Sequence, residues 1–174
     1  MRIITCNEIG KYTQQWWGTF YKNNKNIKNI AIGAHALLNN NSGYKNIAIG
    51  TNTLSSNITT SSNIAIGDSS GLNNQGTGST IGTSTIAIGS SAGQNSQGIS
   101  AIAIGYSAGI SYQSQGAIAI GLTTAQFSQG YRAIAMGWGA GFNNQGPHSI
   151  RIGTDSGSLN QSQYAVAMGY QAGQ

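Results

Sequence analysis

The residues that could carry out acid–base, nucleophilic or metal chemistry are few in this sequence, and they lie far apart. They comprise Glu8, Asp68, Asp155, His35, His148 and Cys6. A glycosidase needs two carboxylates on either side of one bond, and a Ser-His-Asp site or a metal centre needs several such groups together. No short, fixed spacing groups these residues. We therefore expect that the protein is not an enzyme and binds no cofactor or metal.

Charge also limits the classes of partner. Charged residues make up 6% of the 174 residues, hydrophobic residues 39%, and the net charge of +5 comes from the first 45 residues. A nucleic-acid-binding chain would instead carry a basic stripe along the fold, or aromatics among Lys and Arg. We expect no nucleic-acid partner. Because no run of 18 apolar residues occurs, we also expect no membrane insertion, and the first residues lack the apolar stretch of a secretory signal.

A sequence repeat predicts the strands and turns that must position any site. The tetrapeptide Ile-Ala-Ile-Gly, or a variant of it, recurs, and the glycine that closes it is called the marker glycine here. The marker glycines are Gly33, Gly50, Gly67, Gly89, Gly105, Gly121, Gly137, Gly153 and Gly169. Five consecutive spacings are 16 residues, two are 17, and one of 22 contains an insertion near residues 76–80. A unit of this length is too short for a helix pair but accommodates two short strands and two turns.

The repeat predicts an all-β fold. Residues 29–174 should form a β-solenoid with coils of 16–17 residues, stacked in parallel about 4.8 Å apart into a rod on the order of 45 Å long. Residues 1–28 do not repeat and form a separate segment. A solenoid needs a cap at its first coil, and aromatic residues are also favoured anchors in docking peptides. Four residues of this segment are candidates for either role: Trp16, Trp17, Phe20 and Tyr21.

The strand pattern gives a hypothesis about packing. In Ile-Ala-Ile the two isoleucines share one face and the alanine occupies the other, and both faces are apolar, as in a strand that is covered on both sides. We expect the isoleucines to fill the coil and the small alanine to face a second chain. This predicts a closed cyclic oligomer, preferably a trimer, although a dimer or a monomer covered by another protein stays open. On this hypothesis Ile104→Asp damages its own coil.

One strand departs from the pattern, because Arg151 replaces the alanine between two isoleucines. If the alanine column faces the symmetry axis, three arginines meet there and need Asp155, an anion or water as partners. If the column faces solvent, Arg151 is a surface charge. Arg151 and Asp155 are therefore a candidate axial charge cluster.

A column of aromatic residues is a second candidate site. The position after the marker glycine holds Tyr106, Trp138 and Tyr170, in every second coil. The constant spacing places these rings in one line along the rod. They could stack against the sugar rings of a host glycan, or they could cover a turn or pack between subunits, and the second interpretation is the one we favour at this stage.

The repeats also resemble those of known families. Residues 100–109 (Ser-Ala-Ile-Ala-Ile-Gly-Tyr-Ser-Ala-Gly) and 46–50 (Asn-Ile-Ala-Ile-Gly) resemble the head repeats of trimeric autotransporter adhesins. They equally resemble the AIG-type repeats of phage tail fibres and of proteins of large DNA viruses, and residues 29–37 are most like the fibre version. The resemblance covers residues 29–174. It implies a left-handed parallel β-roll, a homotrimer, and use as a stalk or a host-binding head.

The departures from the adhesin pattern decide between these families. The coils are longer than in the adhesin head, and no neck, coiled-coil stalk or membrane anchor is evident. The resemblance then implies a structural protein of a virus or phage particle: a fibre, spike or capsid-associated rod that contacts other virion proteins through residues 1–28. A bacterial cell-surface adhesin head is the alternative. An ice-binding solenoid is disfavoured because the threonines do not recur in register.

Overall fold

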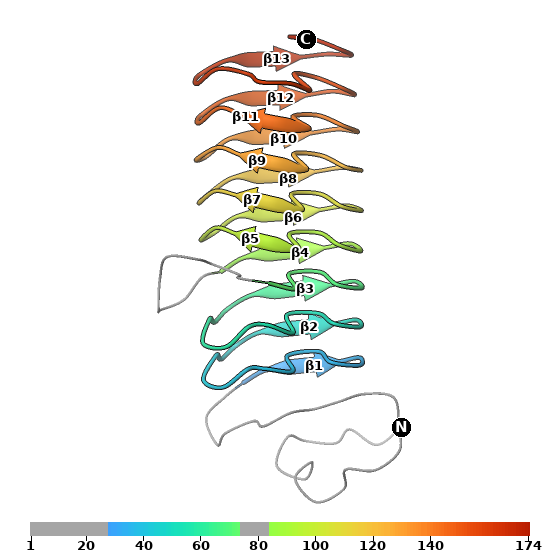
Figure 1. Ribbon diagram of the computed structural model, residues 1–174, viewed down its shortest axis with the longest axis vertical. Coiled ribbons are helices and arrows are strands. Elements are labelled where there is room, and N and C mark those ends of the chain that lie inside the picture. The colour runs from blue at the N-terminus through green and yellow to red at the C-terminus, as the bar shows by residue number, and fades with distance from the viewer. Residues whose placement is uncertain (1–27, 74–83) are drawn as a thin grey trace, which may run out of the picture.

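The structure is a computed structural model that describes residues 28–73 and 84–174, and in it these residues form a β-solenoid (Figure 1). The first sheet has nine strands, all paired in parallel. These are β1 (Ile30–Ile32), β2 (Ile47–Ile49), β3 (Ile64–Ile66), β4 (Ile86–Ile88), β6 (Ile102–Ile104), β8 (Ile118–Ile120), β10 (Ile134–Met136), β12 (Ile150–Ile152) and β13 (Val166–Met168). The all-β solenoid of parallel strands with coils of about 16 residues, predicted from the sequence, is confirmed.

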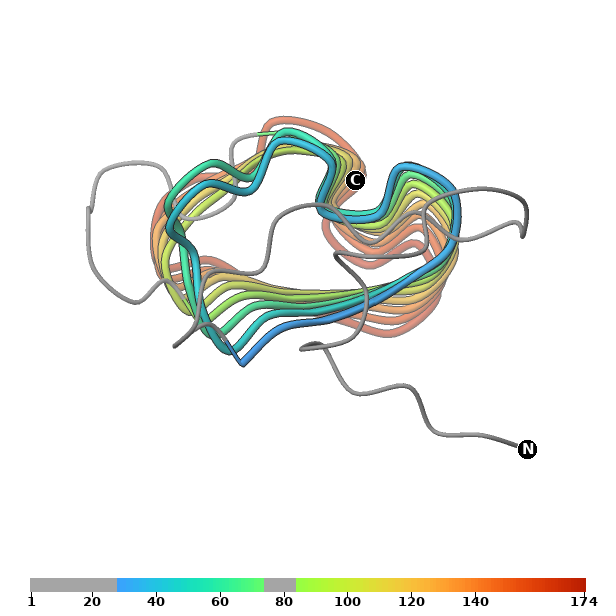
Figure 2. The same ribbon diagram turned by 90° about the horizontal axis from the view of Figure 1, so that it is seen from below.

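A second, four-stranded parallel sheet lies across the coil from the first (Figure 1). Its strands are β5 (Asn95–Gln97), β7 (Ser111–Gln113), β9 (Phe127–Gln129) and β11 (Asn143–Gln145). They run opposite to the first sheet, because each coil returns before it climbs to the next (Figure 1). Seen from below, the coils superimpose into one repeated outline (Figure 2).

Each repeat position becomes a column along the rod. The strands pair without slippage, so that Ile102 lies opposite Ile118 and Ala103 opposite Ala119. The corner after each marker glycine keeps the same ladder, with Thr123 N donating to Tyr106 O at 2.9 Å. A spacing read in the sequence is therefore a distance along the rod, about 4.8 Å for each coil.

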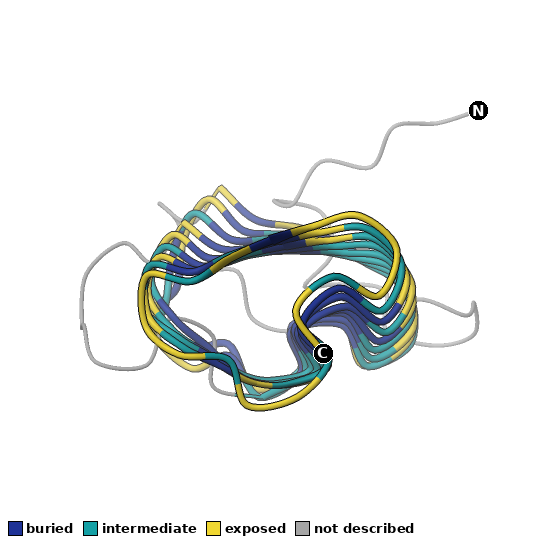
Figure 3. Cartoon of the chain, turned by 90° about the horizontal axis from the view of Figure 1, so that it is seen from above, coloured by how far each residue is buried: buried dark blue, intermediate teal, exposed yellow. Residues whose placement is uncertain are grey.

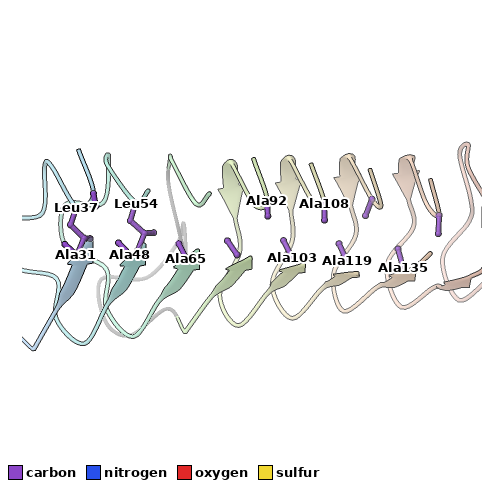
Figure 4. Packing of buried hydrophobic residues seen from close by; sticks show 14 residues of the cluster. Ala31, Leu37, Ala48, Leu54, Ala65, Ala92, Ala103, Ala108, Ala119 and Ala135 are labelled. Carbon is purple, nitrogen blue, oxygen red and sulfur yellow. The ribbon is translucent and has the colours of Figure 1, made fainter. Parts of the chain in front are cut away.

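The side that each strand residue faces is the opposite of the expectation. The central alanine of each Ile-Ala-Ile points into the coil, and Ala103 is 0% exposed. The flanking isoleucines point outward and are half-buried or exposed. Buried residues form stripes that run from coil to coil (Figure 3), and the alanine side chains point at the segment across the coil (Figure 4). The prediction that isoleucine fills the coil and alanine meets a second chain is therefore wrong.

The reason is the narrowness of the coil. In the alanine-to-glycine packing across the coil, a Cβ atom added to Gly109 would lie 3.4 Å from the Cβ atom of Ala103. Where the two facing columns are this close, as at Gly109 and Ala103, the pair itself has room for glycine and alanine only. An inward isoleucine would overpack this space, so the larger side chains occupy the outer face.

The interior changes character along the rod. In the first coils Leu37 and Leu54 fill the space opposite the strand alanine and are buried. In the later coils that position is usually glycine, and a buried glutamine reaches into the space instead. Nε2 of Gln113 donates to Ile102 O at 2.6 Å and to Ala117 O at 3.2 Å. These glutamines are thus core residues that connect the two sides of the coil.

Near the start of the rod, buried asparagines form hydrogen bonds from one coil to the next. Oδ1 of Asn29 accepts from Asn46 N at 2.8 Å, and Oδ1 of Asn46 accepts from Asn63 N at 3.0 Å. Buried polar groups need such partners. No helix long and apolar enough to span a membrane occurs among the residues that the structure describes.

Candidate interaction surfaces

The outer side of the first sheet is an apolar strip, called the isoleucine face here. Each of the nine strands contributes its first and third residue to it. The face consists of Ile30, Ile32, Ile47, Ile49, Ile64, Ile66, Ile86, Ile88, Ile102, Ile104, Ile118, Ile120, Ile134, Met136, Ile150, Ile152, Val166 and Met168. No polar or charged side chain interrupts it along the nine strands. Parallel strands covered on one side only would normally show polar residues on the other.

The isoleucine face is partly self-covered. In the middle of the rod the isoleucines are half-buried, as at Ile102 and Ile104, because neighbouring coils stack on them. Toward the ends they become exposed, as at Ile30 and Val166. Monomeric proteins rarely expose a contiguous apolar area of this extent, and such an area indicates an interaction surface.

The aromatic column lies where the sequence predicts it. Tyr106, Trp138 and Tyr170 follow the marker glycine at the corner beyond the first sheet and are 59%, 59% and 73% exposed. Leu122 occupies the coil between Tyr106 and Trp138, and Thr154 the coil between Trp138 and Tyr170. Backbone hydrogen bonds fix this order: Gly139 N donates to Leu122 O at 3.0 Å, and Gln171 N donates to Thr154 O at 2.9 Å. The structure shows no contact of these three rings with any other described ring. This column therefore offers free ring faces.

A second aromatic ladder was missed by the sequence reasoning. His148 lies between two tyrosines, with ring centroids 5.4 Å from Tyr131 in an edge-on contact and 5.5 Å from Tyr164 in a stacked one. The guanidinium of Arg132 lies 4.9 Å from the ring centroid of Tyr131. These side chains sit at the corner before the first sheet. The 16-residue spacing of His148 and Tyr164 in the sequence could have revealed this ladder. Because the rings of His148 and Tyr164 stack on one another, their facing sides are not free.

The candidate axial charge cluster does not form. Arg151 points into its own coil with the alanine column and is 0% exposed, so it faces neither a symmetry axis nor solvent. Its Nε atom donates to Oε1 of Gln161 at 2.8 Å, whereas Nη1 and Nη2 have no hydrogen-bond partner among the described residues. Burial lowers the pKa of Arg151 to about 10. Asp155 lies instead at the outer corner, beside Trp138.

Asp155 is a neighbour of the aromatic column. Its backbone N donates to Trp138 O at 2.8 Å. Its Oδ1 atom lies 2.5 Å from the position that a Cβ atom on Gly139 would occupy. The carboxylate thus folds back over the glycine that follows Trp138. Glycine at this position makes the room for it.

The remaining candidates for chemistry stay apart. His35 pairs with Asn52, Nδ1 to Oδ1 at 3.1 Å, and Asp68 accepts from Ser69 Oγ at 3.1 Å. In residues 28–73 and 84–174 no three His, Cys, Asp or Glu residues lie close enough to hold a metal ion. An open hollow lined by Ile58, Asn95 and Tyr112, among others, contains no carboxylate or imidazole in its described lining.

The attachment residues Trp16, Trp17, Phe20 and Tyr21 lie outside the described residues, as do Cys6 and Glu8. Their assignment stays a prediction from the sequence. Comparison with protein-family models, with curated proteins and with solved structures found no match to this chain.

Proposed function

We propose that this chain is a structural rod of a virus or phage particle, assembled as a left-handed β-roll homotrimer and used as a fibre, spike or capsid-associated component. The observation that carries the proposal is the isoleucine face, which runs along all nine strands of the first sheet without a polar residue. Fully burying an exposed isoleucine contributes about 1.5–3 kcal/mol, and a half-buried one contributes correspondingly less. A face of this size therefore favours assembly strongly.

A second copy of the chain is the partner that fits this face best. Two copies have the same coil spacing, so that their isoleucine columns match coil for coil along the rod, which an unrelated protein surface would not do. The face also has two columns, one from the first and one from the third residue of each strand. Around a three-fold axis, each column can contact a different neighbour. The resemblance to trimeric adhesin and fibre repeats also supports an assembly of three chains.

The assembly part of the proposal is tested by the mass of the protein in solution. We expect light scattering after gel filtration to give three chains for the unaltered protein and fewer for Ile104→Asp, whose outward position should leave the coil intact by circular dichroism. Tyr112→Asp is the control, because Tyr112 is 68% exposed and lies on the second sheet. A single-chain mass for the unaltered protein contradicts assembly, and a two-chain mass contradicts the three-fold axis.

The particle part of the proposal needs a different experiment. Mass spectrometry of purified particles should detect peptides of residues 28–174 together with the other structural proteins. Detection only in the outer-membrane or cell-surface fraction of a bacterium would contradict this part and would favour the adhesin alternative.

A further inference from the structure

We propose that the aromatic column of Tyr106, Trp138 and Tyr170 binds a linear, uncharged, extended glycan that lies along the rod. The ligand class is a β-1,4-linked polysaccharide chain, whose sugar rings present flat apolar faces at regular intervals. This inference does not depend on the proposed location in a virion, nor on the number of chains in the assembly.

The first support is the free area of the rings. The three side chains are 59%, 59% and 73% exposed, and none contacts another described ring, in contrast with the ladder of Tyr131, His148 and Tyr164. Tyr and Trp supply large, rigid contact area and tolerate a surface that is partly wet. A flat sugar face can therefore stack on each ring without displacing another protein group.

The second support is the spacing. The rings occupy every second coil, and stacked coils are about 4.8 Å apart, so that successive rings are about 9.6 Å apart along the rod. This distance is close to one disaccharide unit of an extended β-1,4-linked chain. Alternate sugars would meet a ring, and the intervening sugars would lie over Leu122 and Thr154, which fill the coils between the rings.

The third support is the polar column beside the rings. The position after Leu122, Thr154 and Tyr170 carries Thr123, Asp155 and Gln171, whereas after the other two rings Ser107 is buried and Gly139 has no side chain. Asp155 has its carboxylate over Gly139, next to Trp138. Carboxylate, hydroxyl and amide groups can hydrogen-bond the sugar hydroxyls that point sideways from a stacked ring. A few such polar groups beside an apolar surface fix orientation and specificity.

Charge favours a neutral glycan over a nucleic acid. Nucleic-acid bases also stack on aromatics, but their binding sites surround the rings with Lys and Arg that contact phosphate. Here the charged group beside the central ring is a carboxylate, Asp155, and Arg151 is buried inside the coil. A phosphate backbone would be repelled where a neutral polysaccharide would not.

The test is calorimetric titration of the whole chain with oligosaccharides of increasing length. We expect cellohexaose or chitohexaose to bind at least tenfold more tightly than the matching disaccharide, because only the longer chain reaches all three rings. Maltohexaose, which is coiled, should bind more weakly. Trp138→Ala should weaken hexasaccharide binding at least tenfold, and Tyr106→Ala and Tyr170→Ala less, because they lie at the ends of the column.

The matched control is Tyr112→Ala, an exposed tyrosine outside the column. It should leave binding unchanged. The inference is overturned if no extended hexasaccharide binds, if affinity does not rise with length, or if Tyr112→Ala weakens binding as much as Trp138→Ala. Light scattering on the same samples separates the two proposals. A trimer that binds no glycan contradicts only the glycan site, and a monomer that binds a glycan contradicts only the trimer.

Discussion

Inside the coil that begins with β12, the Nε atom of Arg151 donates a hydrogen bond of 2.8 Å to Oε1 of Gln161. In every other strand of the first sheet this inward position is alanine. The guanidinium fits because Gly141 and Gly157 lie across from it, where an added Cβ atom would come within 3.1 Å and 2.8 Å of the arginine. Its two Nη atoms have no partner among the described residues. The only charge in the column is thus buried and incompletely satisfied.

We therefore expect Arg151→Ala to stabilise the protein. Alanine restores the packing of the neighbouring coils and removes a buried charge that is incompletely paired. Replacing buried ion pairs by apolar side chains of similar volume has raised stability by about 1–4 kcal/mol elsewhere. The measurement is the free energy of unfolding in guanidinium chloride at fixed protein concentration. Arg132→Ala, which alters an exposed arginine, should change it by less than about 0.5 kcal/mol. A clear loss of stability in Arg151→Ala would show that the hydrogen bond to Gln161 outweighs the buried charge.

The same residue predicts a dependence on alkaline pH. Burial holds the pKa of Arg151 at about 10 in the folded chain, well below the usual value of an arginine in the unfolded chain. Below about pH 10 both states hold the proton, and the folded state bears the full cost of the buried charge. Between the two pKa values the folded protein loses the proton while the unfolded chain keeps it, so that stability rises with pH. The advantage of Arg151→Ala should therefore shrink between about pH 9 and pH 11. A constant difference would contradict the lowered pKa.

Much of the fold could be predicted because the repeat fixes the register. The marker glycines gave the coil length, the strands and the column positions, and the ladder from Thr123 N to Tyr106 O keeps the aromatic column in line. Side-chain size alone could not predict which residues of each strand point into the coil. The sequence reasoning placed Ile104 inside and Ala103 outside, whereas the coil is too thin for inward isoleucine.

The missing signal lay across the coil from the strand. The sequence shows glutamine eight residues before the marker glycine in several coils, as at Gln97, Gln113 and Gln129. In the structure Gln113 fills the interior, and Gly109 leaves space for it, since a Cβ atom there would lie 3.0 Å from Oε1 of Gln113. The first two coils carry Leu37 and Leu54 at the glycine position instead. The exchange of leucine for a glycine–glutamine pair between coils identifies the columns that face the interior. Because these columns fill the coil together with the strand alanine, the isoleucines must point outward.

The marker glycines allow a further prediction about stability. A Cβ atom on Gly89 would lie 2.6 Å from the carbonyl oxygen of Gly105 in the next coil, and the φ of Gly89 is +124°. Gly169 has a similar φ of +118°, but its Cβ would meet nothing closer than Ala172 Cβ at 4.0 Å. Both alanine substitutions strain the backbone. Only Gly89→Ala must also separate two coils.

We expect Gly89→Ala to lower the unfolding free energy by several kcal/mol more than Gly169→Ala, as measured by denaturant unfolding. The difference isolates the contact between coils from the backbone strain that both variants share. Equal losses would show that strain alone explains why glycine occupies this column.

Gln113 allows the interior hydrogen bonds to be measured directly. Its Nε2 atom donates to Ile102 O and Ala117 O, at 2.6 Å and 3.2 Å. Gln113→Ala removes this donor from both carbonyls, although Ala117 O keeps the hydrogen bond that it accepts from Ile102 N at 2.9 Å. A buried group that loses its partner costs about 1–3 kcal/mol, so we expect a loss of about 2–5 kcal/mol from the lost hydrogen bonds together with the emptied space. Gln115→Ala is the matched control, because Gln115 is exposed two residues further along. Similar small losses in both variants would mean that water replaces the amide, and that the glutamine column does not hold the two sides of the coil together.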